Sequence, residues 1–131
     1  MKDDTLWIWF SRFIRLRDSD ENGIATCFTC GTRQKWDSGG MQAGHFIGRR
    51  EQSTKFDEKN VHAQCVHCNH YNAGQQFEYS LQLDRKYGEG TAMKLLIQSK
   101  QLCKRGDFEI KELTKHYQKE VKRLKEEKGL K

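Results

Sequence analysis

Two Cys-x-x-Cys pairs constrain this chain more than any other feature of its sequence. Cys27 and Cys30 form the first pair, Cys65 and Cys68 form the second, and thirty-four residues lie between Cys30 and Cys65. Such pairs are typical of one tetrahedral zinc site, to which each tight turn supplies two thiolates. Because a Cys₄ site has no open coordination position, we expect a structural Zn²⁺ that clamps two distant segments together.

The composition is that of one small, basic domain. Only 35% of the 131 residues are hydrophobic and 32% are charged, so the core is thin and a structural metal would supply stability that it lacks. The formal net charge is +6; four thiolates (−4) and one Zn²⁺ (+2) would bring it to +4. This balance favours a polyanionic partner, with nucleic acid ahead of an acidic membrane surface.

The apolar segments are too short for secretion or for a membrane. The N-terminal run Leu6–Phe10 lacks the length and the cleavage site of a signal peptide, and no stretch reaches transmembrane length. We therefore expect a cytoplasmic protein without membrane contact, in which paired cysteines bind metal rather than form disulfides. The fifth cysteine, Cys103, is assigned to helix packing.

Hydrophobic periodicity predicts an α+β chain that is mostly helical. An apolar stripe predicts a helix over residues 3–17, and residues 24–73 form the zinc-centred core, with a short strand over residues 41–47 and a helix that starts near Cys68. Further helices fill residues 75–131, where proline is absent. The prediction is a single domain over residues 1–131, with the N-terminal stripe and the C-terminal helix as candidate homodimer surfaces.

The interval between the cysteine pairs has room for a β-hairpin, and His45 lies in it. An imidazole such as that of His45 can take a proton from water, and the amide oxygen of Asn69 suits Mg²⁺ or Mn²⁺. A polar basic loop follows the histidine and supplies the candidate DNA-binding residues Arg49, Arg50 and Lys55. Together these side chains indicate a one-metal phosphodiesterase centre.

Several motifs resemble the zinc-containing HNH endonucleases with a ββα-metal centre, and more closely the phage recombination endonuclease family called NinG or Rap. They are Ile14-Arg15-Leu16-Arg17-Asp18, Ala43-Gly44-His45-Phe46, Asn60-Val61-His62-Ala63-Gln64-Cys65 and Cys68-Asn69, with Gly74 and Glu78-Tyr79 downstream. The resemblance covers roughly residues 5–100. It implies a Cys₄ zinc treble-clef core, similar to that of endonuclease VII, and a phage or prophage origin. It also implies divalent-metal-dependent cutting of branched DNA such as Holliday junctions and D-loops.

The resemblance assigns roles to individual residues. The general base falls on His45, the asparagine that braces the hairpin around the base falls on Asn60, and a position that binds the catalytic metal falls on Asn69.

One position departs from the HNH pattern. Many HNH enzymes have an aspartate directly before the base as a metal ligand, and this chain has Gly44. Because a neutral asparagine alone holds Mg²⁺ poorly, we expect a carboxylate from elsewhere, with Glu78 as the first choice and Asp57 and Glu58 next.

The sequence therefore predicts a structure-selective DNA endonuclease that acts as a homodimer, since a two-fold dimer naturally makes paired nicks across a junction. Three alternatives stay open. The first is a non-catalytic zinc module that only binds nucleic acid, for which Gly44 is the best argument. The second is an HNH enzyme that nicks ordinary duplex DNA, and the third is a zinc-scaffolded protein-interaction domain.

Overall fold

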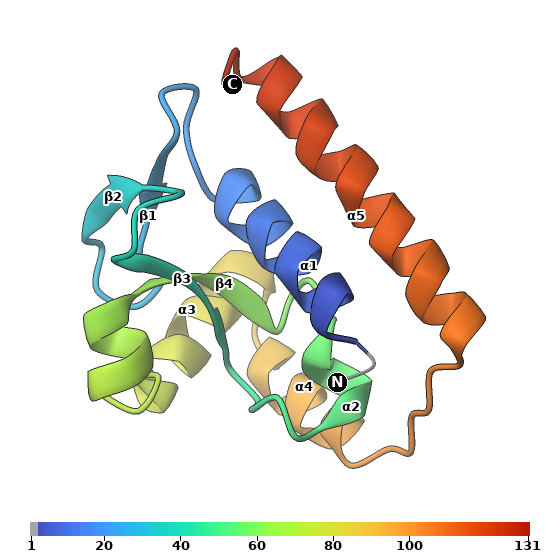
Figure 1. The fold of residues 1–131 in the computed structure, drawn as a ribbon. Coiled ribbons are helices and arrows are strands. Elements are labelled where there is room, and N and C mark those ends of the chain that lie inside the picture. Colours follow the sequence, from blue (N-terminus) through green and yellow to red (C-terminus); the bar gives the residue numbers. More distant parts are fainter. Residues whose placement is uncertain (1–2) are drawn as a thin grey trace.

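The computed structural model describes residues 3–131, which form a mixed α+β fold (Figure 1). The helices are α1 (Asp4–Arg17), α2 (Gln52–Lys55), α3 (Gln76–Tyr87), α4 (Thr91–Ser99), α5 (Asp107–Glu127) and the π-helical turn η1 (His67–Tyr71). The strands are β1 (Ile24–Thr26), β2 (Arg33–Lys35), β3 (Met41–His45) and β4 (Val61–Cys65). They pair as two separate antiparallel sheets, β1 with β2 and β3 with β4.

The β3–β4 pair lies at the centre of the molecule. Its register runs from Met41 opposite Cys65 to His45 opposite Val61, and all five residues of β4 are buried. The β1–β2 hairpin encloses the first cysteine pair, and the Phe28 N–H donates to the carbonyl of Ala63 at 2.8 Å. The first cysteine pair is therefore fixed against β4, the strand that ends in the second pair.

The C-terminal end of α1 is tied to β4 by a partly buried ion pair. Arg17 donates to Asp18 at 2.8 Å and to the backbone carbonyls of Glu58 and Val61 at 2.8 and 2.9 Å. The Asp18 carboxylate also accepts the N–H of Ala63 at 2.8 Å. Burial disfavours the charged form of Asp18, but its hydrogen bonds with Arg17 and its other partners lower the pKa of this carboxyl below its usual value.

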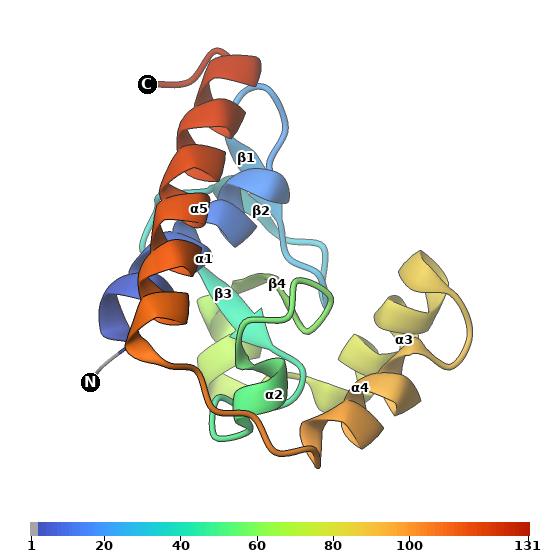
Figure 2. The ribbon, with the colours of Figure 1, turned by 90° about the vertical axis from the view of Figure 1, so that its right-hand side faces the viewer.

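The largest part of the core lies between α1 and α5, which run side by side in both views (Figures 1 and 2). The Phe10 ring is fully buried and meets the Tyr117 ring edge-on at 4.9 Å and the Phe56 ring at 5.4 Å. The residues that share this cluster are Leu6, Phe13, Ile14, Leu16, Val121 and Leu124. The two surfaces predicted to make the dimer thus cover each other within one chain, because their apolar stripes are complementary.

The α3–α4 hairpin lies apart from the α1–α5 pair (Figure 2). Tyr79, Leu83 and Leu95 form its small core, and Phe28, Phe46 and Ile47 from the rest of the chain pack against this cluster. Cys103 lies between α4 and α5, outside any helix and half-buried, so its assignment to helix packing is wrong.

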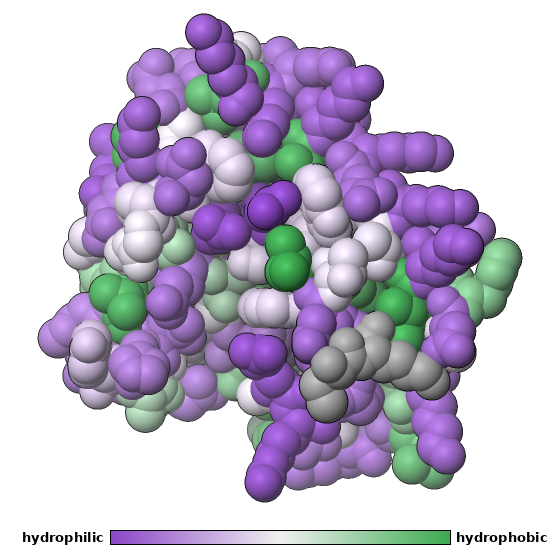
Figure 3. All heavy atoms as spheres, in the orientation of Figure 1, coloured by the Kyte–Doolittle hydropathy of each residue, from purple (hydrophilic) through white to green (hydrophobic). Residues whose placement is uncertain are grey.

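The surface reflects the charged composition. The face shown in Figure 3 is mostly hydrophilic, and its apolar side chains form small separate groups. Within residues 3–131, none of the helices is both long enough and apolar enough to span a bilayer.

Replacement of Phe10 by alanine should destabilise the fold by roughly 3–5 kcal/mol, because it opens a cavity between α1 and α5. Urea unfolding of the zinc-loaded protein measures the change. The control is Ile8→Ala on the same helix, where the side chain is 47% exposed and the loss should stay within about 1 kcal/mol. Equal losses for both variants would contradict this view of the core.

Candidate metal centre and active site

Four cysteine thiols converge where the two sheets meet. The Sγ atoms of Cys27, Cys30, Cys65 and Cys68 all lie within 4.8 Å of one another, and those of Cys30 and Cys65 are 3.7 Å apart. Four sulfurs about 2.3 Å from a tetrahedral Zn²⁺ lie roughly 3.8 Å apart. The predicted ligand set is therefore assembled, and the cluster can hold one zinc ion.

The surroundings of the thiols bear on their ionisation. Burial opposes loss of the proton from Cys27, but hydrogen bonds from the Thr29 hydroxyl and from backbone N–H groups lower its pKa to about 6. Burial raises the pKa of Cys65 and of Cys68. A bound Zn²⁺ would stabilise all four thiolates, because thiols bind zinc in the deprotonated form.

His45 lies at the end of β3, and one of its ring nitrogens is committed to the backbone. Its Nε2 is 3.0 Å from the carbonyl of Lys55. Because a carbonyl only accepts, Nε2 carries the proton and Nδ1 keeps a free lone pair. Burial lowers the pKa of His45 to about 4, and the nearby cations Arg49 and Lys55 act in the same direction. The imidazole is therefore neutral at pH 7 and can accept a proton through Nδ1.

An aromatic and cationic stack covers this histidine. The rings of Trp7 and His45 stack with centroids 4.9 Å apart, and the Arg49 guanidinium lies 5.0 Å from the centroid of the Trp7 ring. The stack fixes the plane of the imidazole and holds an exposed cation beside it.

His45, Asn69 and Arg49 line the same pocket, which has a volume of about 370 Å³. Asn69 extends from η1 and donates through Nδ2 to the Gln42 side chain at 2.7 Å. A neighbouring hollow of about 600 Å³ shares Asn69, Arg49 and Trp7 with this pocket and adds Arg15. The two hollows therefore make a continuous surface with the candidate base at one end and arginines along it.

Asn60 braces the loop that follows His45. Its Oδ1 accepts the N–H of Ile47 at 2.8 Å, and its Nδ2 donates to the carbonyls of Ile47 and Thr54, both at 3.0 Å. The side chain is fully buried. These hydrogen bonds tie the loop after His45 to β4 and to α2.

A second buried histidine supports β3 from the other face. His62 is fully buried, with Nδ1 3.3 Å from the Tyr79 hydroxyl and Nε2 2.8 Å from the Tyr87 hydroxyl. Tyr79 donates in turn to the carbonyl of Gly44 at 2.6 Å. Because that carbonyl only accepts, Nδ1 of His62 donates to Tyr79, and the hydrogen bonds run in one direction toward the residue that precedes His45.

The other predicted ligands lie away from the pocket. Glu78 is exposed on α3 and does not line it. Asp57 accepts from Gln98 at 3.0 Å, and Glu58 accepts from the Tyr117 hydroxyl at 2.9 Å, so both have structural partners.

The predicted DNA-binding residues divide into two groups. Arg49 and Arg50 are exposed. Lys55, in contrast, is buried and donates to Asp3 at 2.8 Å, so its ammonium group is unavailable to a phosphate. No pattern in the sequence indicates this ion pair, whose members are fifty-two residues apart.

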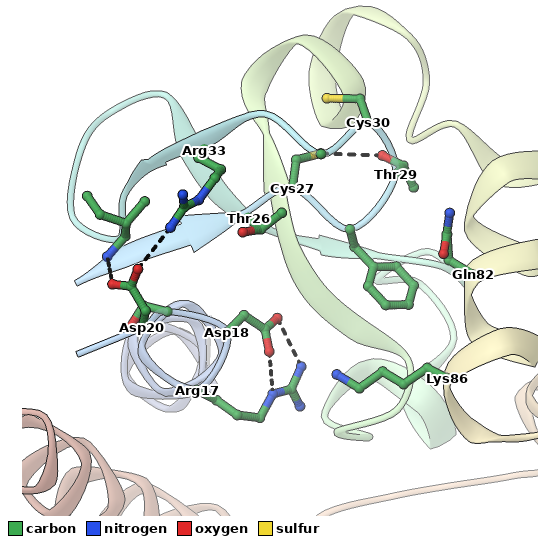
Figure 4. Close-up of a pocket in the computed structure, with 14 residues that line it drawn as sticks. Arg17, Asp18, Asp20, Thr26, Cys27, Thr29, Cys30, Arg33, Gln82 and Lys86 are labelled. Carbon is green, nitrogen blue, oxygen red and sulfur yellow. Dashed lines mark hydrogen bonds and ion pairs between the residues drawn. The ribbon is translucent and has the colours of Figure 1, made fainter. Parts of the chain in front are cut away.

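A larger cavity than the His45 pocket lies beside the first cysteine pair and has a volume of about 730 Å³ (Figure 4). Two of its arginines are paired, Arg17 with Asp18 at 2.8 Å and Arg33 with Asp20 at 2.9 Å. Lys86 extends from α3 toward the first of these pairs. We assign no chemistry to this cavity, because its charges largely compensate one another and the candidate base lies outside it.

Two residues near the site were not singled out from the sequence. Trp7 lies in the N-terminal apolar run Leu6–Phe10, and Gln64 lies in the motif that ends at Cys65. Both side chains are polar or amphipathic and occupy positions that also suit core packing. Only their contacts in the folded structure show that they lie near the site.

The fold and site define a mixed α+β protein with a four-cysteine cluster beside a histidine–asparagine pocket. The family described as Bacteriophage Lambda NinG protein matches residues 3–127. The chain belongs to this family, as the motifs predicted.

Curated relatives agree with this assignment. The chain is 36% identical over 80 residues to Protein ninG of Escherichia phage 933W, a match that covers 59% of this chain and 35% of the relative. It is 37% identical over 79 residues to Protein ninG of Salmonella phage P22, covering 58% and 34% of the two chains. The corresponding protein of Escherichia phage lambda is 35% identical over 80 residues, covering 59% and 35%. The matched part is thus about a third of each relative, and no solved structure matches the chain.

Zinc should be required for folding. We expect one Zn²⁺ per chain in the purified protein, and loss of helical circular dichroism when a strong chelator removes it. Cys65→Ser should abolish both zinc binding and folding, whereas Cys103→Ser should change neither. A chain that stays folded without zinc would show that the thiol cluster is not a structural metal site.

The buried His62 should make stability fall in mild acid. The pKa of His62 is lowered by burial from 6.5 to about 3, so the folded state needs the neutral ring. This contribution is complete above pH 6.5 and is lost as the pH falls toward 3. It amounts to roughly 2 kcal/mol between pH 6.5 and pH 5. His62→Gln should show a correspondingly shallower decrease in urea titrations, and an unchanged slope would contradict the burial of a neutral His62.

Proposed function

We propose that this chain is a divalent-metal-dependent DNA endonuclease that cuts branched DNA. The observation that carries the proposal is the shared pocket of His45, Asn69 and Arg49 beside the cysteine cluster. It combines a neutral base with a free nitrogen, an oxygen ligand and an exposed cation, which are the groups that phosphodiester hydrolysis needs.

Each group has one task in the proposed reaction. His45 takes a proton from the attacking water through Nδ1, while the carbonyl of Lys55 and the Trp7 ring hold the imidazole in place. Arg49 and Arg50 contact phosphates that flank the scissile bond. A bound Mg²⁺ or Mn²⁺ would neutralise charge on the scissile phosphate.

The cysteine cluster supports the site without taking part in the reaction. Cys68 directly precedes Asn69, so a zinc ion that fixes Cys68 also fixes the start of η1 against β3. This arrangement of a hairpin, a metal cluster and a short helix supports the proposed treble-clef, ββα-metal type of core.

Branched DNA and a homodimer belong to the same proposal. Cutting a junction requires two nicks related by symmetry, which a two-fold dimer supplies. Since α1 and α5 cover each other, the dimer would use another surface. We further propose a cytoplasmic site of action in a host bacterium, where phage DNA recombines.

A non-catalytic nucleic-acid-binding module is the second candidate. It is favoured by one observation: no carboxylate is among the residues that line the His45 pocket within the described part of the chain. In that case Asn69 and Arg49 would bind DNA, and His45 would be a stacked structural histidine.

Cleavage of a synthetic four-way junction and of a linear duplex with matched sequence separates these functions. With Mg²⁺ or Mn²⁺, we expect the zinc-loaded wild type to cut the junction. His45→Ala should lower the rate by about 100-fold or more, because it removes the general base, while junction binding persists. The matched control is His116→Ala, which replaces an exposed histidine on α5 and should leave the rate unchanged.

The other outcomes of this experiment identify which alternative function applies. Equal cutting of junction and duplex would indicate a general HNH nickase. Binding that weakens steeply with salt, without cutting under either metal, would indicate the non-catalytic module.

A further inference from the structure

Two amide side chains, those of Gln64 and Asn69, lie close to Gly44. A Cβ atom built on Gly44 would lie 1.9 Å from Oε1 of Gln64 and 3.0 Å from Oδ1 of Asn69. The first distance is far below any real contact, so the Gln64 amide fills the place where a side chain at position 44 would project. The oxygens of two different amides therefore face the same small region next to His45.

The orientation of the Gln64 amide is set by its partners. Its Nε2 donates to the Thr29 hydroxyl at 3.0 Å and to the carbonyl of Gly74 at 2.9 Å. A backbone carbonyl can only accept, so the nitrogen must be the atom on that side. The oxygen then has to face Gly44.

The Gln64 oxygen is also an orphan. The side chain is fully buried, and Oε1 has no hydrogen-bond partner among the described residues. A buried carbonyl oxygen without a partner is costly, and in native proteins it calls for a reason such as an ion. Asn69 stands in a comparable position, because its Nδ2 is used by Gln42 and its Oδ1 lies on the Gly44 side.

We infer that Gln64 is a ligand of the divalent cation in the proposed active site, with its Oε1 acting together with Oδ1 of Asn69. The inference rests on the proposed function and supplies the ligand that Glu78, Asp57 and Glu58 do not provide. Position 44, where the resemblance implies an acidic ligand, is glycine, and the oxygen of Gln64 reaches that space from β4.

The donor set determines how such a site behaves. Mg²⁺ and Mn²⁺ accept amide oxygens but prefer charged ones, and Mg²⁺ usually keeps several waters and takes further oxygens from substrate phosphates. Two neutral amides neutralise none of the charge of the cation. The free protein should therefore bind the cation weakly, and DNA phosphates should strengthen its binding.

Binding of Mn²⁺ to the zinc-loaded full chain without DNA tests the inference, with free Mn²⁺ measured by electron paramagnetic resonance. We expect one Mn²⁺ site in the wild type. Gln64→Met keeps the length of the side chain but removes the oxygen, and should raise Kd by roughly tenfold or more. Gln64→Glu keeps an oxygen at the same place, adds charge, and should bind Mn²⁺ at least as tightly as the wild type.

The control is Gln98→Met, which removes another amide whose nitrogen donates two hydrogen bonds, to Ser53 and Asp57. It should leave the Kd for Mn²⁺ unchanged. If Gln64→Met fails to fold, the effect of Mn²⁺ on the melting temperature of Gln64→Glu tests the ligand role instead. A carboxylate that faces the Gly74 carbonyl should destabilise the fold when no cation is bound. Mn²⁺ should therefore raise the melting temperature of this variant more than that of the wild type.

The outcomes separate this inference from the proposed function. Unchanged Mn²⁺ binding in folded Gln64→Met, or a Gln64→Glu variant that Mn²⁺ does not stabilise beyond the wild type, would overturn the ligand role of Gln64 even if the wild type cuts junctions. Mn²⁺ binding that depends on Gln64 in a protein that cuts no DNA would support the cation site and reject the nuclease.

Discussion

The convergence of four thiols from distant parts of the chain is the constraint on which the rest of the structure depends. Cys27 and Cys30 follow β1, whereas Cys65 and Cys68 lie where β4 passes into η1. Holding these segments together fixes the β3–β4 pair between them, and with it the position of His45 relative to Asn69. A chain with so little apolar surface has few other means of fixing this geometry.

The second organising feature is a row of buried polar side chains along β4. Asn60, His62 and Gln64 alternate with apolar residues, a pattern that normally indicates a strand with one exposed face. Here all three are fully buried, and each directs its hydrogen bonds to the backbone or to hydroxyls around β3. Because buried polar groups need specific partners, this row defines the surroundings of His45 more sharply than apolar packing would.

The sequence predicted the elements better than their contacts. The apolar stripes located α1 and α5, and the interval between the cysteine pairs correctly suggested a strand with His45. The same stripes were interpreted as dimer surfaces, although they pack on each other. Periodicity shows that a face is apolar but not what covers it. For a related reason the sequence did not indicate that Lys55 pairs with Asp3 or that Glu78 is exposed on α3, since charge and position along the chain do not reveal a long-range partner or a direction in space.

The amino-acid sequence establishes which chemical groups are present: the spacing of the thiols indicates a metal site, the motifs indicate the family, and position 44 is glycine. The folded structure sets which of these groups meet. It stacked Trp7 on His45, buried Lys55 against Asp3, and turned the oxygen of Gln64 into the space beside Gly44. These contacts join residues far apart in sequence, and their geometry depends on strand register and on hydrogen-bond direction, neither of which a linear pattern records.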